Sequence, residues 1–233
     1  MVSRPRRLLA EFLGTLLLTA VVVGSGIAAQ RLTPGAPGLE LAENALATAL
    51  GLFVLILVFA PISGAHLNPV ISLVDAILGR RSWVDSLSYI PAQIAGCIAG
   101  AIVANLMFGR AAVSLSTNSR MTTAHFSSEI VATAGLVLVV FLLARTGHER
   151  LAPAAVGAYI GAAYFFTSST SFANPAITVG RMFSNSFAGI APASVPGFIS
   201  AQVIGAGIGL AIVLTLTPAP PAHSTKMASE AIE

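Results

Sequence analysis

Two short apolar stretches that open with Asn-Pro constrain this chain more than any other feature of its sequence. They cover about residues 68–79 and 174–184 and lie among six longer apolar runs. As a helix, a stretch of about 11 residues measures about 16 Å, about half of the roughly 30 Å hydrocarbon core of a membrane. Asn is a favourable N-cap, and Pro fits the first helical turn. The pattern therefore predicts two half-helices that begin at membrane depth.

The six longer runs have the length of membrane-spanning helices. The chain has 233 residues, of which 9% are charged, whereas soluble domains contain about 25%. A spanning helix needs about 20 apolar residues. Thr and Ser interrupt the fifth run, which leaves its end undetermined. We expect an all-α membrane protein with six transmembrane helices and two re-entrant half-helices. The six expected spans are about 8–29, 42–60, 87–108, 128–144, 152–168 and 194–216.

Charge placement predicts the orientation of the chain. Six spans put both termini on one side, which carries eight Arg and Lys residues against four on the other. The positive-inside rule then places both termini in the cytoplasm. Residues 1–217 are expected to form one domain, and the Pro-, Ala- and Ser-rich segment 218–233 has the composition of a disordered cytoplasmic tail. The small net charge of +3, spread over several loops, gives no sign of nucleic-acid binding.

The two halves of the sequence repeat each other, at about 8–108 and about 128–216. Each repeat has a Glu in its first span, an Asn-Pro box, and a last span with the pattern Gln-x-x-Gly-x-x-x-Gly. Because each half has three spans, the second copy is inverted in the membrane, and inverted repeats with broken helices place a solute site near the midplane. The matched residues are Glu11 and Glu129, Gln93 and Gln202, Gly96 and Gly205, and Gly100 and Gly209.

These motifs together resemble the aquaporin or major intrinsic protein family over about residues 8–216. The resemblance rests on the Glu of the first span, on S-G-A-H-x-N-P before the first half-helix and on the second N-P-A. It points to the bacterial aquaglyceroporin-like branch, and "TSSTSFANPAIT" resembles the members linked with arsenic resistance. The resemblance implies the aquaporin fold, a homotetramer with one pore per subunit, and the inner membrane of a bacterium. It implies no cofactor and no metal.

The Asn-Pro boxes are the first candidate site. By themselves Asn68 and Asn174 could be ordinary N-caps. As a matched pair in an inverted repeat, they would bring two helix N-termini together, each with about half a positive charge, which repels cations. The resemblance implies that both Asn amides face the solute. The boxes read Asn68-Pro69-Val70 and Asn174-Pro175-Ala176, and Val70 adds bulk where the boxes touch.

The segments before the boxes are the expected pore lining. Small residues permit an extended backbone whose carbonyl oxygens face a channel, and the candidates are Gly64, Ala65, Phe172 and Ala173. His66 could be a packed histidine or could line the cytoplasmic half of the pore, and the resemblance favours the second.

Glu11 and Glu129 are costly inside a membrane. Near a span edge they could be surface charges, and a proton relay is another reading. Because they match in both repeats, we expect them to anchor loop N–H groups beside the boxes.

The expected selectivity filter departs from the family pattern. The family usually has an arginine directly behind the second NPA, and this chain has Ile177 there. Family spacing adds Thr48 and Ser171, and the fourth position is Tyr164 by helix register or Ala162 by counting. This filter is wider and less charged than that of a water-selective pore. We expect it to pass glycerol, urea or metalloid hydroxides such as arsenite.

Arg181 lies four residues beyond Ile177, one turn further on the same helix face. It could reach back to the pore mouth as a substitute donor. Alternatively, it could pair with loop groups or face interfacial water.

The motifs bear on three classes of function. A passive channel for water and small neutral solutes fits the motifs. A secondary transporter with broken helices is the alternative, but that class usually carries a charged residue at the midplane. An enzyme is not expected, because the sequence has no nucleophile elbow, no His-Glu-x-x-His and no carboxylate pair in a span. The expected partners are the bilayer, water and neutral solutes.

Overall fold

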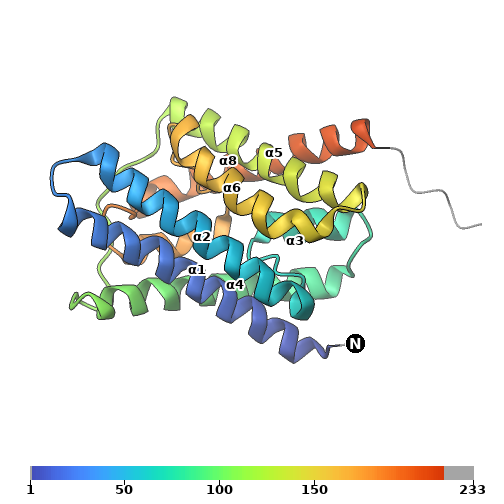
Figure 1. Cartoon of the computed structure of the whole chain (residues 1–233), viewed down its shortest axis with the longest axis horizontal. Coiled ribbons are helices and arrows are strands. Elements are labelled where there is room, and N and C mark those ends of the chain that lie inside the picture. The colour runs from blue at the N-terminus through green and yellow to red at the C-terminus, as the bar shows by residue number, and fades with distance from the viewer. Residues whose placement is uncertain (1, 218–233) are drawn as a thin grey trace, which may run out of the picture.

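The computed structural model describes residues 2–217, and the expectation for the tail 218–233 lies outside this range. All regular secondary structure in the described range is helical (Figure 1). The α-helices are α1 (Arg4–Leu32), α2 (Pro37–Ser63), α3 (Pro69–Ile77), α4 (Trp83–Met107), α5 (Thr123–Arg145), α6 (Ala152–Phe166), α7 (Pro175–Gly180) and α8 (Val195–Leu216). Three short 3-10 turns are η1 (Glu149–Leu151), η2 (Arg181–Phe183) and η3 (Pro192–Ser194).

Six helices occupy the six apolar runs. Five of them in the described range are long and apolar enough to cross a membrane. The sixth, α6, has 15 residues, about 22 Å of helix, and follows η1 without a break. It ends at Phe166, two residues before the expected limit, because Thr167 adopts an extended conformation and its hydroxyl bonds to the Ala163 carbonyl oxygen at 2.6 Å.

The two half-helices begin directly after the Asn-Pro signals. In α3, the Asn68 side chain accepts a hydrogen bond from the Val70 N–H at 3.1 Å. In α7, the Asn174 side chain accepts from the N–H groups of Ala176 at 3.0 Å and Ile177 at 3.2 Å. Helix α3 has 9 residues and α7 has 6, so neither crosses a membrane.

The packing repeats between the two halves. Helix α1 packs against α2 and α4, α5 packs against α6 and α8, and α2 contacts α6 across the halves. Gly96 lets α4 approach α1 closely, because a Cβ atom there would collide with the Phe12 carbonyl oxygen. Gly205 has the same role in α8, where a Cβ atom would lie 2.5 Å from the Ile130 carbonyl oxygen. Sequence-matched glycines thus make equivalent helix contacts.

The N-terminus and the last turn of α8 lie at the same end of the bundle, on the right of Figure 1. We call this the near end and the opposite one the far end. The loops after α2, α3 and α5 are at the near end, and those after α1 and α4 are at the far end. The two ends of the described chain lie on the same side because an even number of helices runs the length of the bundle.

Candidate functional site

The two half-helix N-termini meet inside the bundle through their asparagines. The Asn68 Nδ2 donates to the Ala173 carbonyl oxygen at 2.8 Å, and the Asn174 Nδ2 donates to the Leu67 carbonyl oxygen at 2.7 Å. Each amide oxygen caps its own helix, so the position of each NH₂ group is fixed. One hydrogen of each NH₂ group is used in the crossing bond, which leaves the other for a ligand.

In the loop before each half-helix, two residues separated by one adopt the left-handed backbone conformation. In the first loop Ala65 and Leu67 have φ of 47° and 49°, and in the second Ser171 and Ala173 have φ of 48° and 47°. Such backbone costs about 1 kcal/mol or more for each non-glycine residue and persists only where the surroundings enforce it. The strain lies at matching positions of the two repeats.

A buried carboxylate holds the second of these loops. Glu129 is fully buried and accepts hydrogen bonds from the N–H groups of Phe172 and Ala173, both at 2.9 Å. The Gln202 side chain donates to the same carboxylate at 2.7 Å and to the Thr178 hydroxyl at 2.9 Å. The Glu129 carboxyl group is therefore fully engaged by hydrogen bonds inside the bundle and is not a surface group.

Glu11 makes the equivalent contacts in the first loop. It is fully buried and accepts from the N–H groups of His66 at 3.0 Å and Leu67 at 2.7 Å. The Gln93 side chain donates to it at 2.8 Å, and the Ser63 hydroxyl donates at 2.6 Å. In both repeats a carboxylate and a glutamine therefore bind the strained loop to its neighbouring helices.

A cavity of about 700 Å³ passes these loops and extends toward the near end. Its wall contains both box asparagines and the four filter candidates. Ala162, the alternative at the fourth filter position, is exposed on the outside of α6. The expected pore-lining residues in the wall are Gly64, Ala65, His66, Phe172 and Ala173.

The four filter candidates present two kinds of surface to the cavity. The hydroxyl groups of Thr48 and Tyr164 hydrogen-bond to each other at 3.0 Å. The Ser171 hydroxyl is buried and has no hydrogen-bond partner within residues 2–217. Ile177 contributes an apolar side chain that is 4% exposed. The wall here combines hydroxyl groups with apolar surface.

Comparison with known proteins identifies this architecture. A family model described as "Major intrinsic protein" matches residues 1–173. Aquaglyceroporin AqpS from Rhizobium meliloti (strain 1021) is 47% identical over 217 residues, which are 93% of this chain and 92% of that protein. The chain belongs to the major intrinsic protein family. It is therefore a multi-pass membrane channel and not an enzyme.

Two further comparisons agree with this family. The glycerol uptake facilitator protein of Streptococcus pneumoniae (strain ATCC BAA-255 / R6) is 31% identical over 77% of this chain and 83% of that protein. The X-ray structure of the aquaglyceroporin from Plasmodium falciparum matches with a TM-score of 0.68 at 22% identity, over 92% of this chain and 98% of that one. The structural likeness concerns the fold, and it confirms the expected aquaporin fold.

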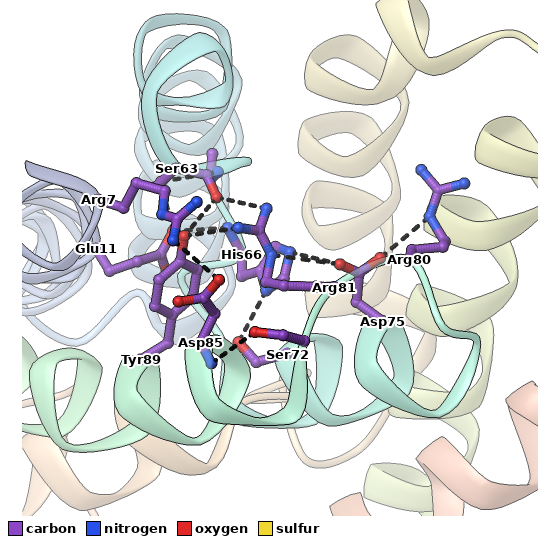
Figure 2. A network of polar contacts seen from close by, with 12 residues as sticks. Arg7, Glu11, Ser63, His66, Ser72, Asp75, Arg80, Arg81, Asp85 and Tyr89 are labelled. Atoms are coloured by element: carbon purple, nitrogen blue, oxygen red, sulfur yellow. Dashed lines mark hydrogen bonds and ion pairs between the residues drawn. The ribbon is translucent and has the colours of Figure 1, made fainter. Parts of the chain in front are cut away.

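The near mouth of this family member carries an ion cluster that no sequence motif predicted (Figure 2). Asp75, at the end of α3, lies 3.3 Å from His66 Nε2, 3.1 Å from Arg80 Nε and 3.5 Å from Arg81 Nε. Arg80 also bonds to Glu149 of η1 at 2.6 Å. All five side chains line the cavity. The one sequence signal that could have indicated this cluster is Asp75, an acidic residue within the apolar stretch 68–79.

His66 is both packed and part of the cavity wall. Its Nδ1 lies 3.0 Å from the Ser72 hydroxyl, and its ring meets the Tyr89 ring edge-on with centroids 5.4 Å apart. The two sequence-based readings of His66 are thus not exclusive.

The carboxyl group of Asp75 is held in its charged form. Burial by itself would raise its pKa, but the hydrogen bond and charge of His66 and the charges of Arg80 and Arg81 outweigh this effect. The pKa of Asp75 therefore lies below the usual 3.8. Helix α3 is a half-helix, so this group lies at the near mouth and not within a spanning segment.

Arg181 is placed inside the far half of the channel and not at the surface. Its side chain is 2% exposed, it stacks on Phe172 with the guanidinium carbon 3.4 Å from the ring centroid, and its Nε donates to the Ala188 carbonyl oxygen. The prediction that Arg181 pairs with loop groups therefore holds for its Nε, which bonds to the loop carbonyl oxygen of Ala188.

Proposed function

We propose that this chain is a passive channel for water and glycerol-like neutral solutes, with a filter wider than that of a water-selective pore. Two relatives support this solute class by their names, an aquaglyceroporin and a glycerol uptake facilitator. The observation that carries the proposal is Ile177, because an apolar side chain lines the cavity where the family usually has its filter arginine.

The filter chemistry suits a solute with one hydroxylated and one apolar side. Ile177 offers apolar contact, and Ser171 and the Thr48–Tyr164 pair offer hydroxyl groups. Glycerol has carbon–hydrogen and hydroxyl edges that match such a wall. The paired N-termini of α3 and α7 place partial positive charge beside the box asparagines, which disfavours cations.

Metalloid hydroxides belong to the same proposal. Arsenous acid is uncharged at neutral pH and resembles a small polyol in size and hydrogen bonding, so a pore that accepts glycerol would also accept it. The support is chemical likeness and the "TSSTSFANPAIT" pattern around the second box. Uptake of arsenite into vesicles that contain the protein, measured against empty vesicles, tests this extension.

The setting of the channel is proposed from charge and family. Eight of the twelve Arg and Lys residues belong to segments on the side of the termini, which favours cytoplasmic termini by the positive-inside rule. The bacterial relatives favour the inner (cell) membrane of a bacterium. We also propose a homotetramer with one pore per subunit, in which residues 1–217 form the channel domain.

A filter substitution tests the proposal. Replacing Ile177 by Arg introduces a long charged donor into the cavity, so we expect glycerol permeability to fall at least about tenfold more than water permeability, the effect of a barrier about 1.4 kcal/mol higher. Ile177→Val is the matched control, because it keeps an apolar wall and should leave the ratio unchanged. Stopped-flow light scattering of proteoliposomes measures both permeabilities. An equal loss of both in a well-expressed I177R protein would contradict the role given to Ile177.

The alternative function is secondary transport of a small solute through broken helices. The residues at the meeting point of α3 and α7 are asparagine, proline and apolar residues. The neighbouring carboxylates of Glu11 and Glu129 are bonded to loop N–H groups and to glutamine side chains, so they are already engaged and not open to a coupling ion. A flux that requires an imposed proton or sodium gradient would favour the transporter.

A further inference from the structure

Arg181 stands at a junction between two cavities. Beyond the main cavity, a vestibule of about 480 Å³ opens at the far end, with Gln30, Asn118 and Phe187 in its wall. Arg181 is the one described residue that lines both the vestibule and the main cavity. A solute that crosses from one to the other therefore passes its guanidinium group.

The donors of Arg181 are only partly used within the protein. Its Nε donates to the Ala188 carbonyl oxygen, while Nη1 and Nη2 have no hydrogen-bond partner within residues 2–217. Neither nitrogen is among the buried polar atoms that lack a partner, so both retain surface toward the cavities. The side chain as a whole is 2% exposed, which means that this surface belongs to the channel interior.

The charge of Arg181 has no acidic partner in the described chain. No carboxylate lies within ion-pair distance of it in residues 2–217, and the Phe172 ring supplies a cation–π contact instead. A buried, unpaired charge at membrane depth is expensive and marks a functional position by default. The stacking on Phe172 also fixes the plane of the guanidinium, so its free donors point in a defined direction.

A second polar group near Arg181 is also unused. The Ser171 hydroxyl is buried, lines the main cavity and has no hydrogen-bond partner in the described range. Ser171 precedes Phe172, the residue on which Arg181 stacks. A native structure rarely leaves such a group unsatisfied, and a hydroxylated solute would supply what both side chains lack: acceptor oxygens for Arg181, and a donor or an acceptor for Ser171.

We propose that Arg181 is a specificity-determining donor of this channel, whose two Nη nitrogens hydrogen-bond to the hydroxyl oxygens of a polyhydroxylated solute as it passes from the vestibule into the pore. Arg181 thereby replaces water that the solute loses on entry. The inference rests on the proposed function and assigns the solute recognition to a residue one helical turn beyond Ile177. A water molecule loses fewer hydrogen bonds on entry than a polyol does, so water flux depends less on this donor.

The test measures glycerol and water permeability of the full chain in proteoliposomes. We expect Arg181→Met to lower the ratio of glycerol to water permeability about tenfold, the lower end of the effect of a hydrogen bond to a charged group. Arg181→Lys keeps the charge but not the planar fork of donors, so we expect a loss of about threefold. Arg31→Met is the matched control, because Arg31 also stacks on a phenylalanine and bonds to a carbonyl oxygen but lines neither cavity.

A solute of similar size separates recognition from a change in pore width. Propane-1,3-diol lacks one hydroxyl group of glycerol, so Arg181→Met should reduce its permeability less than that of glycerol. A purely structural role would reduce both alike. Equal losses for the two solutes, or a ratio in both Arg181 variants within twofold of the wild type, would overturn the inference.

The outcomes also separate this inference from the proposed function. A wild-type channel that passes water but no glycerol contradicts the proposed function itself. Glycerol flux in the wild type that neither Arg181 variant alters contradicts the inference alone. If Arg181→Met does not reconstitute, Arg181→Lys decides, and an unchanged ratio in that variant overturns the inference.

Discussion

Replacing Glu129 by Gln should weaken the loop that carries half of the candidate filter. The Phe172 N–H bonds to one carboxylate oxygen, and the Ala173 N–H and the Gln202 side chain bond to the other. Glutamine has one acceptor oxygen, so in its better orientation its NH₂ group faces the Phe172 N–H. The variant then loses one hydrogen bond to a charged group, about 1.5–3 kcal/mol, and leaves a buried N–H unpaired, about 1–3 kcal/mol.

The expected loss of unfolding free energy is therefore about 2.5–6 kcal/mol, or a fall of roughly 5–24 °C in melting temperature for a chain of this length. The loop strain adds a functional effect, because Ser171 and Ala173 have φ of 48° and 47° only while the loop is held. We expect glycerol flux per reconstituted protein to fall together with stability.

Thermal unfolding in detergent and stopped-flow flux measure the two effects of Glu129→Gln. Glu43→Gln is the matched control, since within residues 2–217 its carboxylate accepts one long hydrogen bond, from the Thr33 hydroxyl at 3.3 Å. That variant should unfold within about 2 °C of the wild type, as surface substitutions usually do. A Glu129→Gln protein with wild-type melting temperature and flux would refute the claim that the carboxylate holds the loop.

Two further predictions concern packing and pH. Gly96→Ala should cost about 2 kcal/mol or more, because its Cβ atom would collide with the Phe12 carbonyl oxygen. Gly207→Ala should leave the melting temperature unchanged or higher, because in the described range no atom outside its own helix lies within 4 Å of the added Cβ atom. Equal effects of the two substitutions would contradict the close contact at Gly96. Because the pKa of Asp75 is lowered in the folded state, its contribution to stability is complete above its usual pKa of 3.8 and is lost as the pH falls below that value. Melting temperatures from pH 6 to pH 3 should therefore fall less steeply for Asp75→Asn than for the wild type, and identical profiles would show that the ion cluster does not stabilise the fold.

Local signals in the sequence predicted much of this molecule. Asn68 and Asn174 each cap their own helix, so the start of each half-helix depends on neighbours two or three residues away. The matched glycines predicted close helix packing, because only a missing Cβ permits the approach seen at Gly96 and Gly205. The end of the fifth run, which the sequence left undetermined, lies at Phe166, where the chain leaves the helix α6.

Contacts that depend on the path of a loop could not be predicted in the same way. Arg181 stacks on Phe172 of the loop before α7, and it bonds to Ala188 because the segment after η2 returns to Arg181, whose carbonyl oxygen also accepts from the Ile190 N–H. The ion pair between Arg80 and Glu149 joins two loops that lie 69 residues apart. Neither arrangement has a periodic or motif signal, so each required the three-dimensional structure.

The most direct test of the account is glycerol permeability of the wild-type protein in vesicles without any ion gradient. Vesicles that contain the protein and empty vesicles are mixed with a glycerol gradient, and reswelling is followed by light scattering. For a passive channel we expect rapid glycerol entry that rises linearly with concentration and does not change when a proton or sodium gradient is imposed. Entry that saturates and requires such a gradient, or no entry beyond that of empty vesicles, would contradict it.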